Sequence, residues 1–462
     1  MNITGKDLKK WGLPAGPVYK VALETIGRLG MNKETARRAI VALAGSPASY
    51  LDDDDWAKAA RLLVPAEDKN PRMKEKGCPI KIFGQHMIEQ GALNQIYTAS
   101  KLPVSVQAAL MPDGHQGYGL PIGGVLATDN VVIPYAVGVD IGCRMHMTVT
   151  DMPASKMKGM SGALKNALVD NTVFGAGQEI NGRVEHSIMD DERFDIKAIK
   201  PFKHTAEKQL GTSGGGNHFV EFGSFEAKGL GVAEPVVAIL SHSGSRGFGS
   251  NVAKVYTKIA MDKCKLPKEA KHLAWLSLDD EDGQEYWEAM NVAGEYAQAC
   301  HEVIHSRILK ALKLSAVETI QNHHNFAWKE TLPTCEDVIV HRKGATPAHL
   351  ADVGIIPGSM TTPTYVVTGK GYPDALSSSS HGAGRLMSRA AAKQSFTMSQ
   401  MKKDLAEQGV ELIGGSLDEC SMAYKDIDLV MGQQAALVEI QGRFLPFMVR
   451  MAGEQTKSWE KK

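Results

Sequence analysis

Carboxylate, thiol and imidazole side chains gather in one stretch of the sequence, Met111–Met147 (MPDGHQGYGLPIGGVLATDNVVIPYAVGVDIGCRMHM). Asp140 and Cys143 are three residues apart, directly after the apolar run Val131–Val139. That spacing brings a carboxylate and a thiol together at a strand end or turn, where they could bind one metal ion or bridge two. A thiolate is a preferred ligand of soft and borderline divalent ions. A buried cysteine beside a turn-capping Asp is the commoner arrangement, so this pair alone leaves both interpretations open. The stretch also contains Asp113, His115 and His146.

Four later segments each place a histidine in a short polar or glycine-rich loop beside a predicted strand. Glycine lets the backbone approach a ligand closely. A single histidine of this kind is more often structural, but four such loops together with Asp140 and Cys143 favour two incomplete metal shells with open positions for substrate oxygens. The segments are GTSGGGNHFVE with Asn217, His218 and Glu221, SHSGSRGFG with His242 and Arg246, QNHHN with His324 and Asn325, and SSSSHGAGR with His381 and Arg385.

Length and composition are those of a globular enzyme. The chain has 462 residues, 43% of them hydrophobic, and a formal net charge of zero, so no global basic field indicates nucleic acid. Six cysteines without a CxxC pair argue against a disulfide framework or zinc ribbon and favour a reducing compartment. Without a signal peptide or an apolar run of membrane-spanning length, we expect a cytoplasmic protein.

Two regions differ in pattern. Residues 1–75 are predicted to form a small helical domain, with helices over Pro17–Arg28, Asn32–Leu43 and Asp53–Leu63. A polar, Pro-containing linker follows around residues 69–77. Residues 76–462 alternate short strands with helices but lack a regular βαβ rhythm, which predicts an α/β or α+β domain with a mixed sheet. Within it we expect a surface insertion at 182–205, a single helix at 387–407 and a helix-rich segment at 250–313.

Two further motifs carry competing interpretations. His301–His305 (HEVIH) matches the H-E-x-x-H pattern of zinc proteases. Its flanks fit a packed amphipathic helix and no third ligand follows nearby, so we interpret the match as accidental. Arg342 and Lys343, in the run HRKGATPA, could contact phosphate, although basic residues at a strand end are as often solvated.

Taken together, residues 78–442 resemble the RtcB-type RNA-splicing ligases. The motifs PDGHQGYGLPIGG, GVDIGC, GGGNHF-E, HSGSRG, HHN, HRKGAT, IPGSM, SHGAGR and AYKD occur in the order typical of that family. Such an ordered set is far more specific than any single pattern. The resemblance implies an α+β, mixed-sheet catalytic fold of the family's own, unlike a Rossmann or P-loop fold. It also implies that GTP and two Mn²⁺ ions are the cofactors.

Site residues follow from the resemblance position by position. Cys143 would bridge the two Mn²⁺ ions, one held also by His242 and His324 and the other by Asp140 and His218. His381 would be the nucleophile that becomes guanylated. The guanylate would be bound by Asn217, Glu221, Ser359, Gly382, Ala383, Gly384 and Tyr424, and RNA phosphate would be met by Arg246 and Asn325.

The activity implied is the joining of RNA ends that bear a 2′,3′-cyclic phosphate or 3′-phosphate to 5′-hydroxyl ends. The cyclic phosphate would be opened, GMP would pass from His381 to the 3′-phosphate, and the 5′-hydroxyl would displace GMP. The partners would be such RNA ends, GTP and, in some settings, an activating helper protein, with no membrane involved.

The chain departs from the family pattern at two places. Arg144 follows Cys143 where the family has Gly, which could crowd or recharge the metal site. In the tail FMVRMAGEQTKSWEKK, Arg450 is a candidate replacement for the family's nucleotide-contacting Lys, although Arg differs from Lys in shape. The segment TGKDLKKWGLPAGPVYKVALE in residues 1–75 resembles helical RNA-contacting pieces of tRNA nucleotidyltransferases. A generic helical cap or oligomerisation module fits those residues equally well.

Two other functions remain open on the sequence. The first is a metal-dependent RNA phosphoesterase or cyclic phosphodiesterase that has lost efficient guanylation through the altered tail. The intact SHGAGR setting of His381 argues against it. The second is a non-catalytic RNA-binding paralogue, which retention of the metal and nucleophile positions disfavours.

Overall fold

The computed structural model describes residues 3–64, 71–182, 184–227, 234–334 and 336–453. The chain divides into two compact units, Met1–Asn70 and Pro71–Lys462. The predicted linker falls partly on residues 65–70, which lie outside the described residues. None of the helices in the described ranges combines the length and apolar character needed to cross a bilayer.

The N-terminal unit is a small helical bundle with its own core. Thr4 and Asp7 form a capping box at the start of the first helix. The Asn32 side chain accepts from the backbone N–H groups of Glu34 and Thr35 and so begins the third helix. Leu8, Ile40 and Leu43 are fully buried in the shared core. The helices are α1 (Gly5–Lys10), α2 (Val18–Arg28), α3 (Lys33–Gly45) and α4 (Ala57–Leu63).

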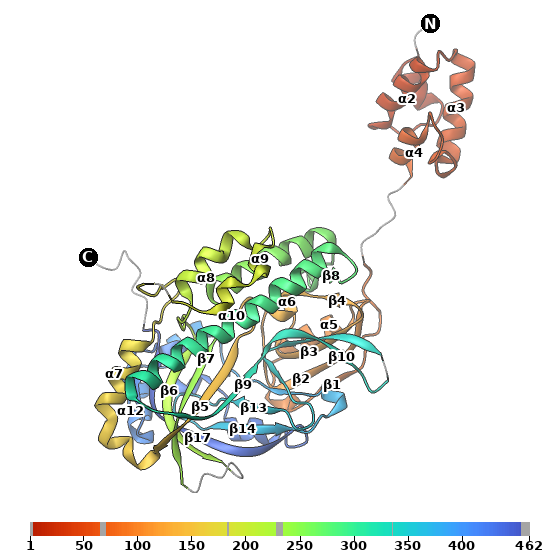
Figure 1. The fold of residues 1–462 in the computed structure, drawn as a ribbon. Coiled ribbons are helices and arrows are strands. Elements are labelled where there is room, and N and C mark those ends of the chain that lie inside the picture. The colour runs from red at the N-terminus through yellow and green to blue at the C-terminus, as the bar shows by residue number, and fades with distance from the viewer. Residues whose placement is uncertain (1–2, 65–70, 183, 228–233, 335, 454–462) are drawn as a thin grey trace. The chain divides into compact units, whose positions relative to one another are not determined.

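The second unit is built on two sheets, which confirms the predicted mixed-sheet α+β fold (Figure 1). Most neighbouring strands are antiparallel, but β1 pairs with β2 and β16 with β17 in parallel. In order across the smaller sheet the strands are β1 (Ile80–Ile82), β2 (Ser105–His115), β3 (Ile122–Thr128), β11 (Asp337–Lys343) and β10 (Asn325–Thr331). In the larger sheet they are β13 (Val353–Ile356), β14 (Thr364–Gly369), β17 (Val438–Met451), β6 (Phe219–Ala227), β7 (Val236–Ser243), β5 (Arg144–Pro153) and β9 (Ala316–His323), with β16 (Glu411–Ile413) added beside β17.

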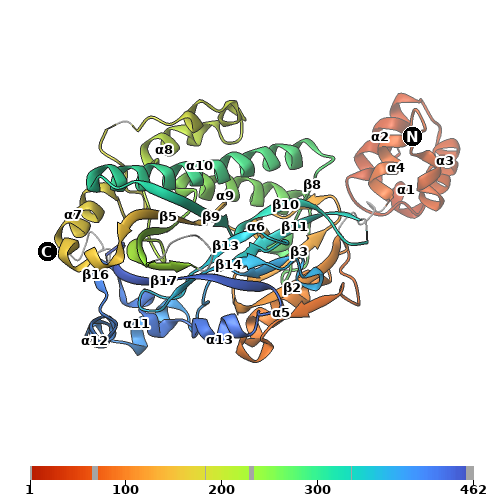
Figure 2. The ribbon, with the colours of Figure 1, turned by 60° about the horizontal axis from the view of Figure 1, so that its bottom comes forward.

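Helices cover both sides of the larger sheet (Figure 2). On one side lie α9 (Arg246–Lys263) and the 32-residue α10 (Glu281–Leu312), and on the other α11 (Arg389–Ser395), α12 (Met398–Gln408) and α13 (Ile427–Gly432). The remaining elements are α5 (Gln90–Ser100), α6 (Pro134–Val137), α7 (Ser161–Asn171), α8 (Lys203–Gln209) and two short strand pairs, β4 (Val131–Val132) with β8 (Leu276–Ser277) and β12 (Ala345–Pro347) with β15 (Ser378–Ser380).

Three local expectations differ from the structure. The predicted surface insertion at 182–205 instead contributes Phe194 and Ile199, both fully buried, to the core against α9 and α10. The single helix expected at 387–407 is two, because Thr397 adopts an extended conformation and caps α12. The 14-residue strand β17 was not expected, since Gly442 and Pro446 interrupt its pattern. Pro446 is tolerated because the ladder with β6 shifts register next to it.

Candidate active site

Strand ends and loops bring the thiol and the imidazoles of the metal hypothesis together beside one cavity of about 920 Å³. Cys143 directly precedes β5, His242 lies near the end of β7 and His218 directly precedes β6. Because β5, β6 and β7 are neighbours in the larger sheet, their ends meet. The residue before Cys143 packs closely against α10 and must be glycine. Gly142 has φ +65°, and a Cβ there would lie 2.6 Å from the Cα of Gly294 in α10.

The ligand atoms of Cys143, His218 and His242 all lie within 4.8 Å of one another, and all three residues are buried. The Sγ atom of Cys143 is 3.2 Å from His242 Nε2 and 3.5 Å from His218 Nε2. Asp140 Oδ2 adds a carboxylate 3.0 Å from His218 Nε2. His324 Nε2 lies 3.3 Å from His242 Nε2, so all five predicted ligands are adjacent.

The protonation states suit a divalent cation. Burial lowers the pKa of His242 to about 3 and that of His324 well below its usual range, which leaves both rings neutral. Burial alone raises the pKa of Asp140, but the hydrogen bond and charge interaction with His218 and the positive charge of Arg246 together outweigh it and keep the carboxyl ionised. Burial, reinforced by Asp140, raises the pKa of the Cys143 thiol well above normal. A bound cation would reverse that last effect by stabilising the thiolate, so this donor set fits a metal ion.

Backbone carbonyls fix the orientation of two of the imidazoles. His242 Nδ1 lies 3.1 Å from the carbonyl oxygen of Asn217, and His218 Nδ1 lies 3.0 Å from that of Ser213. Donation from Nδ1 leaves the Nε2 lone pair of His242 facing the cluster, which is the arrangement of a metal-binding imidazole. His218 differs, because its Nδ1 accepts from Arg246 Nη2 at 2.9 Å and its ring proton is therefore on Nε2, toward Asp140; a bound cation would displace that proton.

His381 lies in the wall of the same cavity and is held by a residue 268 positions away. Its Nδ1 is 2.6 Å from Oδ2 of Asp113, and the same oxygen accepts the backbone N–H groups of His381 at 3.1 Å and Gly382 at 3.3 Å. Gly384 has φ +74°, and any Cβ there would lie 2.1 Å from the Asp113 carbonyl oxygen. The glycines of SHGAGR therefore allow this loop to close onto Asp113.

Asp113 is fully buried and ionised. Burial alone raises its pKa, but His381 and the Lys425 ammonium more than compensate and lower it below its usual value. Lys425 Nζ donates to the carbonyl oxygens on either side of Asp113, those of Pro112 at 3.0 Å and Gly114 at 2.8 Å. The sequence singled out Asp113 as a candidate group but assigned it no role. Lys425 follows Tyr424 in the AYKD motif, which was the available signal for it.

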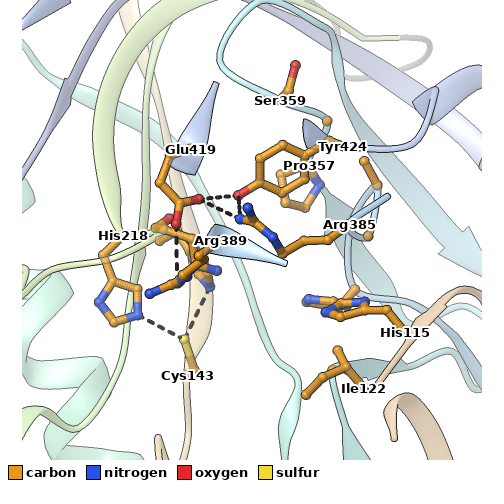
Figure 3. A pocket seen from close by; sticks show the side chains of 18 of the residues that line it. His115, Ile122, Cys143, His218, Pro357, Ser359, Arg385, Arg389, Glu419 and Tyr424 are labelled. Carbon is orange, nitrogen blue, oxygen red and sulfur yellow. Dashed lines mark hydrogen bonds and ion pairs between the residues drawn. The ribbon is translucent and has the colours of Figure 1, made fainter. Parts of the chain in front are cut away.

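The predicted guanylate-site residues all line this cavity: Asn217, Glu221, Ser359, Gly382, Ala383, Gly384 and Tyr424. Burial raises the pKa of Glu221 well above its usual value, so that its carboxyl is neutral. Figure 3 shows Tyr424 in a polar cluster that the sequence did not anticipate. In it the buried Glu419 carboxylate contacts the Tyr424 hydroxyl and forms ion pairs with Arg385 and Arg389, each at 3.2 Å.

The two residues predicted to meet RNA phosphate, Arg246 and Asn325, both make hydrogen bonds within the protein. Arg246 donates from Nη1 to the Ser213 carbonyl at 2.5 Å, from Nε to the Gly244 carbonyl at 3.0 Å and from Nη2 toward His218 Nδ1 at 2.9 Å. It therefore orients His218 and does not line the cavity, and its contact with RNA stays a prediction. Asn325 does line the cavity, and its side chain bonds the Asp140 carbonyl at 3.2 Å and the Gly344 N–H at 2.8 Å.

Arg342 and Lys343 also face inward. The Arg342 guanidinium is fully buried and pairs with Glu330 at 2.6 Å. Lys343 is buried too, and its Nζ donates to the carbonyls of Tyr118 at 2.5 Å and Tyr135 at 3.0 Å. Neither residue lines the cavity, and neither lies at a solvated strand end.

Neither of the two residues that depart from the family pattern, Arg144 and Arg450, lines the cavity. Arg144 points toward α10, where it donates to Gln298 at 3.0 Å and to the Gly294 carbonyl at 3.2 Å, so it does not crowd the metal ligands. Arg450 lies over the Phe174 ring and bonds the Leu168 carbonyl, while its neighbours Val449 and Met451 line the cavity. The Arg450 guanidinium therefore points away from the cavity in which the nucleotide site is predicted. Tail residues 454–462 lie outside the described residues.

The H-E-x-x-H match is structural, as expected. His301 and His305 are buried on α10, and both contact the Ser241 hydroxyl, at 2.6 and 2.7 Å. His305 also contacts the Thr148 hydroxyl at 2.8 Å. These bonds attach α10 to strands β5 and β7.

Comparison with known proteins agrees with this geometry. The family model described as tRNA-splicing ligase RtcB matches residues 95–198 and 186–452. The chain is 32% identical to the RNA-splicing ligase RtcB of Escherichia coli K12, over 82% of this chain and 96% of the relative. It is 31% identical to the tRNA-splicing ligase RtcB of Nanoarchaeum equitans (82% and 96%) and 30% identical to that of Thermococcus kodakarensis (84% and 97%). The chain therefore belongs to the RtcB family of RNA-splicing ligases.

Proposed function

We propose that this chain is a cytoplasmic RNA ligase that joins 2′,3′-cyclic phosphate or 3′-phosphate RNA ends to 5′-hydroxyl ends, using GTP and two Mn²⁺ ions and passing through a GMP–histidine intermediate. Family membership supports RNA ligation in general. The observation that carries the specific chemistry is the 2.6 Å contact between His381 Nδ1 and buried Asp113, in a cavity shared with the Cys143 cluster.

In this proposal His381 is the nucleophile. Donation of the Nδ1 proton to Asp113 leaves the Nε2 lone pair available to a phosphate. The Nε2–P bond to the α-phosphate of GTP forms as the bond between that phosphorus and the bridging oxygen breaks, and pyrophosphate leaves. The Asp113 carboxylate stabilises the positive charge that develops on the ring.

The metal-holding residues would be Cys143 for both ions, His242 and His324 for one, and Asp140 and His218 for the other. When bound, the metal would supply charge neutralisation and Lewis-acid polarisation at the phosphates. Thiolate and imidazole donors also suit zinc, so the assignment of manganese rests on the family resemblance and is tested by metal substitution.

The nucleotide would be bound by Asn217, Glu221, Ser359, Gly382, Ala383, Gly384 and Tyr424. Glu221 is proposed to face the guanine edge. A buried carboxyl that is neutral in the free protein gains partners when the N–H donors of guanine arrive, which favours its ionised form. Asn325 is the proposed side-chain contact for RNA phosphate, and Arg246 is proposed to orient His218.

The later steps would use the same cavity. GMP is transferred from His381 to the 3′-phosphate of the RNA, after any cyclic phosphate has been opened. The 5′-hydroxyl of the second RNA end then attacks that phosphate and GMP leaves. The partners are thus the two RNA ends and GTP, and a helper protein that accelerates turnover is compatible with this scheme.

The test is intact-mass spectrometry of the full chain after incubation with GTP and Mn²⁺, comparing wild type with His381→Ala. We expect a GMP adduct on wild type and none on the variant. An adduct of equal yield on His381→Ala would refute the assignment of the nucleophile. ATP in place of GTP is the matched nucleotide control.

A second candidate is the phosphoesterase or cyclic phosphodiesterase without efficient guanylation. It is favoured by the position of Arg450, which points away from the cavity. Metal-loaded wild type that forms no GMP adduct but hydrolyses a 2′,3′-cyclic phosphate would establish this alternative.

A further inference from the structure

One exposed aromatic ring stands on the wall of the cavity. Among the described Tyr, Phe and Trp residues only Tyr97 and Tyr118 are exposed, with exposed fractions of 41% and 68%. Tyr118 lines the cavity that contains Cys143 and His381, whereas Tyr97 lies on α5 away from it. The Tyr118 ring is therefore accessible to a substrate that enters the cavity.

The loop that carries Tyr118 is fixed by side chains from the preceding segment and α5. Glu89 accepts the backbone N–H of Gln116 at 2.6 Å. Gln95 on α5 bonds Gly117 twice, accepting its N–H at 3.0 Å and donating to its carbonyl at 2.6 Å. An amide side chain that satisfies both backbone groups of one residue replaces a strand partner and holds the loop in one conformation.

Tyr118 itself is held by contacts of its carbonyl and its ring with Lys343, Tyr135 and His272. Its carbonyl accepts from the buried Lys343 ammonium at 2.5 Å. Its ring meets Tyr135 and His272 edge to face, with centroids 6.3 and 6.2 Å apart. Gly119, with φ +72°, permits the close approach, because a Cβ there would lie 3.0 Å from the His272 carbonyl oxygen. The ring is therefore supported at its edges and remains largely exposed to solvent.

Distance along the chain limits what this ring can reach. Tyr118 is five positions after Asp113, the partner of His381, so the Cα atoms of the two residues lie at most about 18 Å apart. At about 3.4 Å per stacked nucleotide, this covers the terminal few nucleotides of a strand whose end is at His381. The flanking residues His115 and Ile122 line the cavity and are labelled in Figure 3.

We propose that Tyr118 is a preorganised stacking platform for a base near the end of the RNA substrate. This inference rests on the proposed function, because it assumes that an RNA end enters this cavity. A rigid aromatic ring loses little conformational entropy on stacking and accepts any base, which suits an enzyme that recognises the chemistry of an RNA end more than its sequence.

The experiment measures binding of two short RNA oligonucleotides by fluorescence anisotropy in the presence of Mn²⁺ and without GTP. One oligonucleotide has a 3′-phosphate and a blocked 5′ end, and the other has a 5′-hydroxyl and a blocked 3′ end. For Tyr118→Ala we expect affinity to fall on the order of tenfold, whereas Tyr118→Phe and Tyr118→Trp keep a ring and should bind nearly as wild type does. Tyr97→Ala is the matched control and should not change affinity.

A loss confined to one oligonucleotide assigns the stacked base to that RNA end, and a loss for both places the platform where the ends meet. Thermal melting of each variant separates a folding defect from a binding defect. Equal RNA affinity of Tyr118→Ala, Tyr97→Ala and wild type would overturn this inference while leaving the ligase proposal intact. If wild type neither forms a GMP adduct nor ligates RNA, the proposed function itself fails.

Discussion

The contact between Asp113 and His381 gives the sharpest prediction. Asp113→Asn removes the negative charge while keeping the size of the side chain, and it can be accommodated in two ways. If the amide NH₂ faces His381, Nδ1 must accept, so the proton moves to Nε2 and the nucleophilic lone pair is lost. If the amide oxygen faces His381, the NH₂ occupies the position of Oδ1, which has no hydrogen-bond partner among the described residues. The ring then also lacks a negative charge to stabilise it during attack.

Both orientations predict a slow enzyme. In a serine protease triad, the equivalent change of the aspartate that orients the histidine lowers the rate about 10⁴-fold. We expect guanylation of Asp113→Asn to be about 10³–10⁴-fold slower, equivalent to about 4–5.5 kcal/mol of barrier. The assay is the time course of GMP adduct formation by intact-mass spectrometry at saturating GTP and Mn²⁺, with melting temperature and metal affinity measured in parallel.

Glu330→Gln is the matched control for loss of a partly buried carboxylate, since Glu330 pairs with Arg342 and His349 and does not line the cavity. It should lower the melting temperature without slowing guanylation. A guanylation rate of Asp113→Asn within about tenfold of the wild-type rate would refute the reasoning, because the loss of charge and the change of tautomer together predict a much larger decrease.

Three further predictions concern metal binding by Cys143, guanine recognition by Glu221 and the structural role of Arg144. Below the raised pKa of the Cys143 thiol, metal binding must displace its proton, so isothermal titration should show log K for Mn²⁺ rising by about one per pH unit. Cys143→Ser should abolish that dependence on pH. A wild-type Mn²⁺ affinity that does not change with pH would contradict the prediction. Glu221→Gln should weaken the preference for GTP over ATP in adduct formation, and an unchanged preference would remove Glu221 from the guanine edge. Arg144→Met should lower the free energy of unfolding by about 1–3 kcal/mol, measured by calorimetry, because it leaves buried acceptors unpaired. It should leave Mn²⁺ affinity unchanged, and a large affinity loss would instead place Arg144 in the metal site.

The sequence could mark the motif residues as candidates because glycine-rich loops and strand ends are local features and the order of the motifs is that of the family. The five proposed metal ligands and His381 were identified without coordinates, and the structure brings all six to one cavity. The helices of residues 1–64 were predicted from periodicity and capping, both of which act within one or two turns. Their function stays a hypothesis, since the family match begins at residue 95.

Side-chain direction could not be predicted from the sequence. Arg450 was a candidate for the nucleotide site, but successive residues of a strand point to opposite faces, and Val449 and Met451 take the cavity side. Arg246 and Arg342 could equally have met phosphate. Which face a residue occupies depends on the register of strands and loops distant in the sequence.

The sequence by itself determined the chemical groups, the order of the motifs and hence the family. Only the tertiary structure decided which groups act on one another. The partner of His381 is Asp113, 268 residues earlier, and that pairing depends on Lys425 and Gly384 holding two distant loops together. No local pattern encodes such a contact, because it arises from packing of the whole domain, whereas the residue types needed for the chemistry are written directly in the chain.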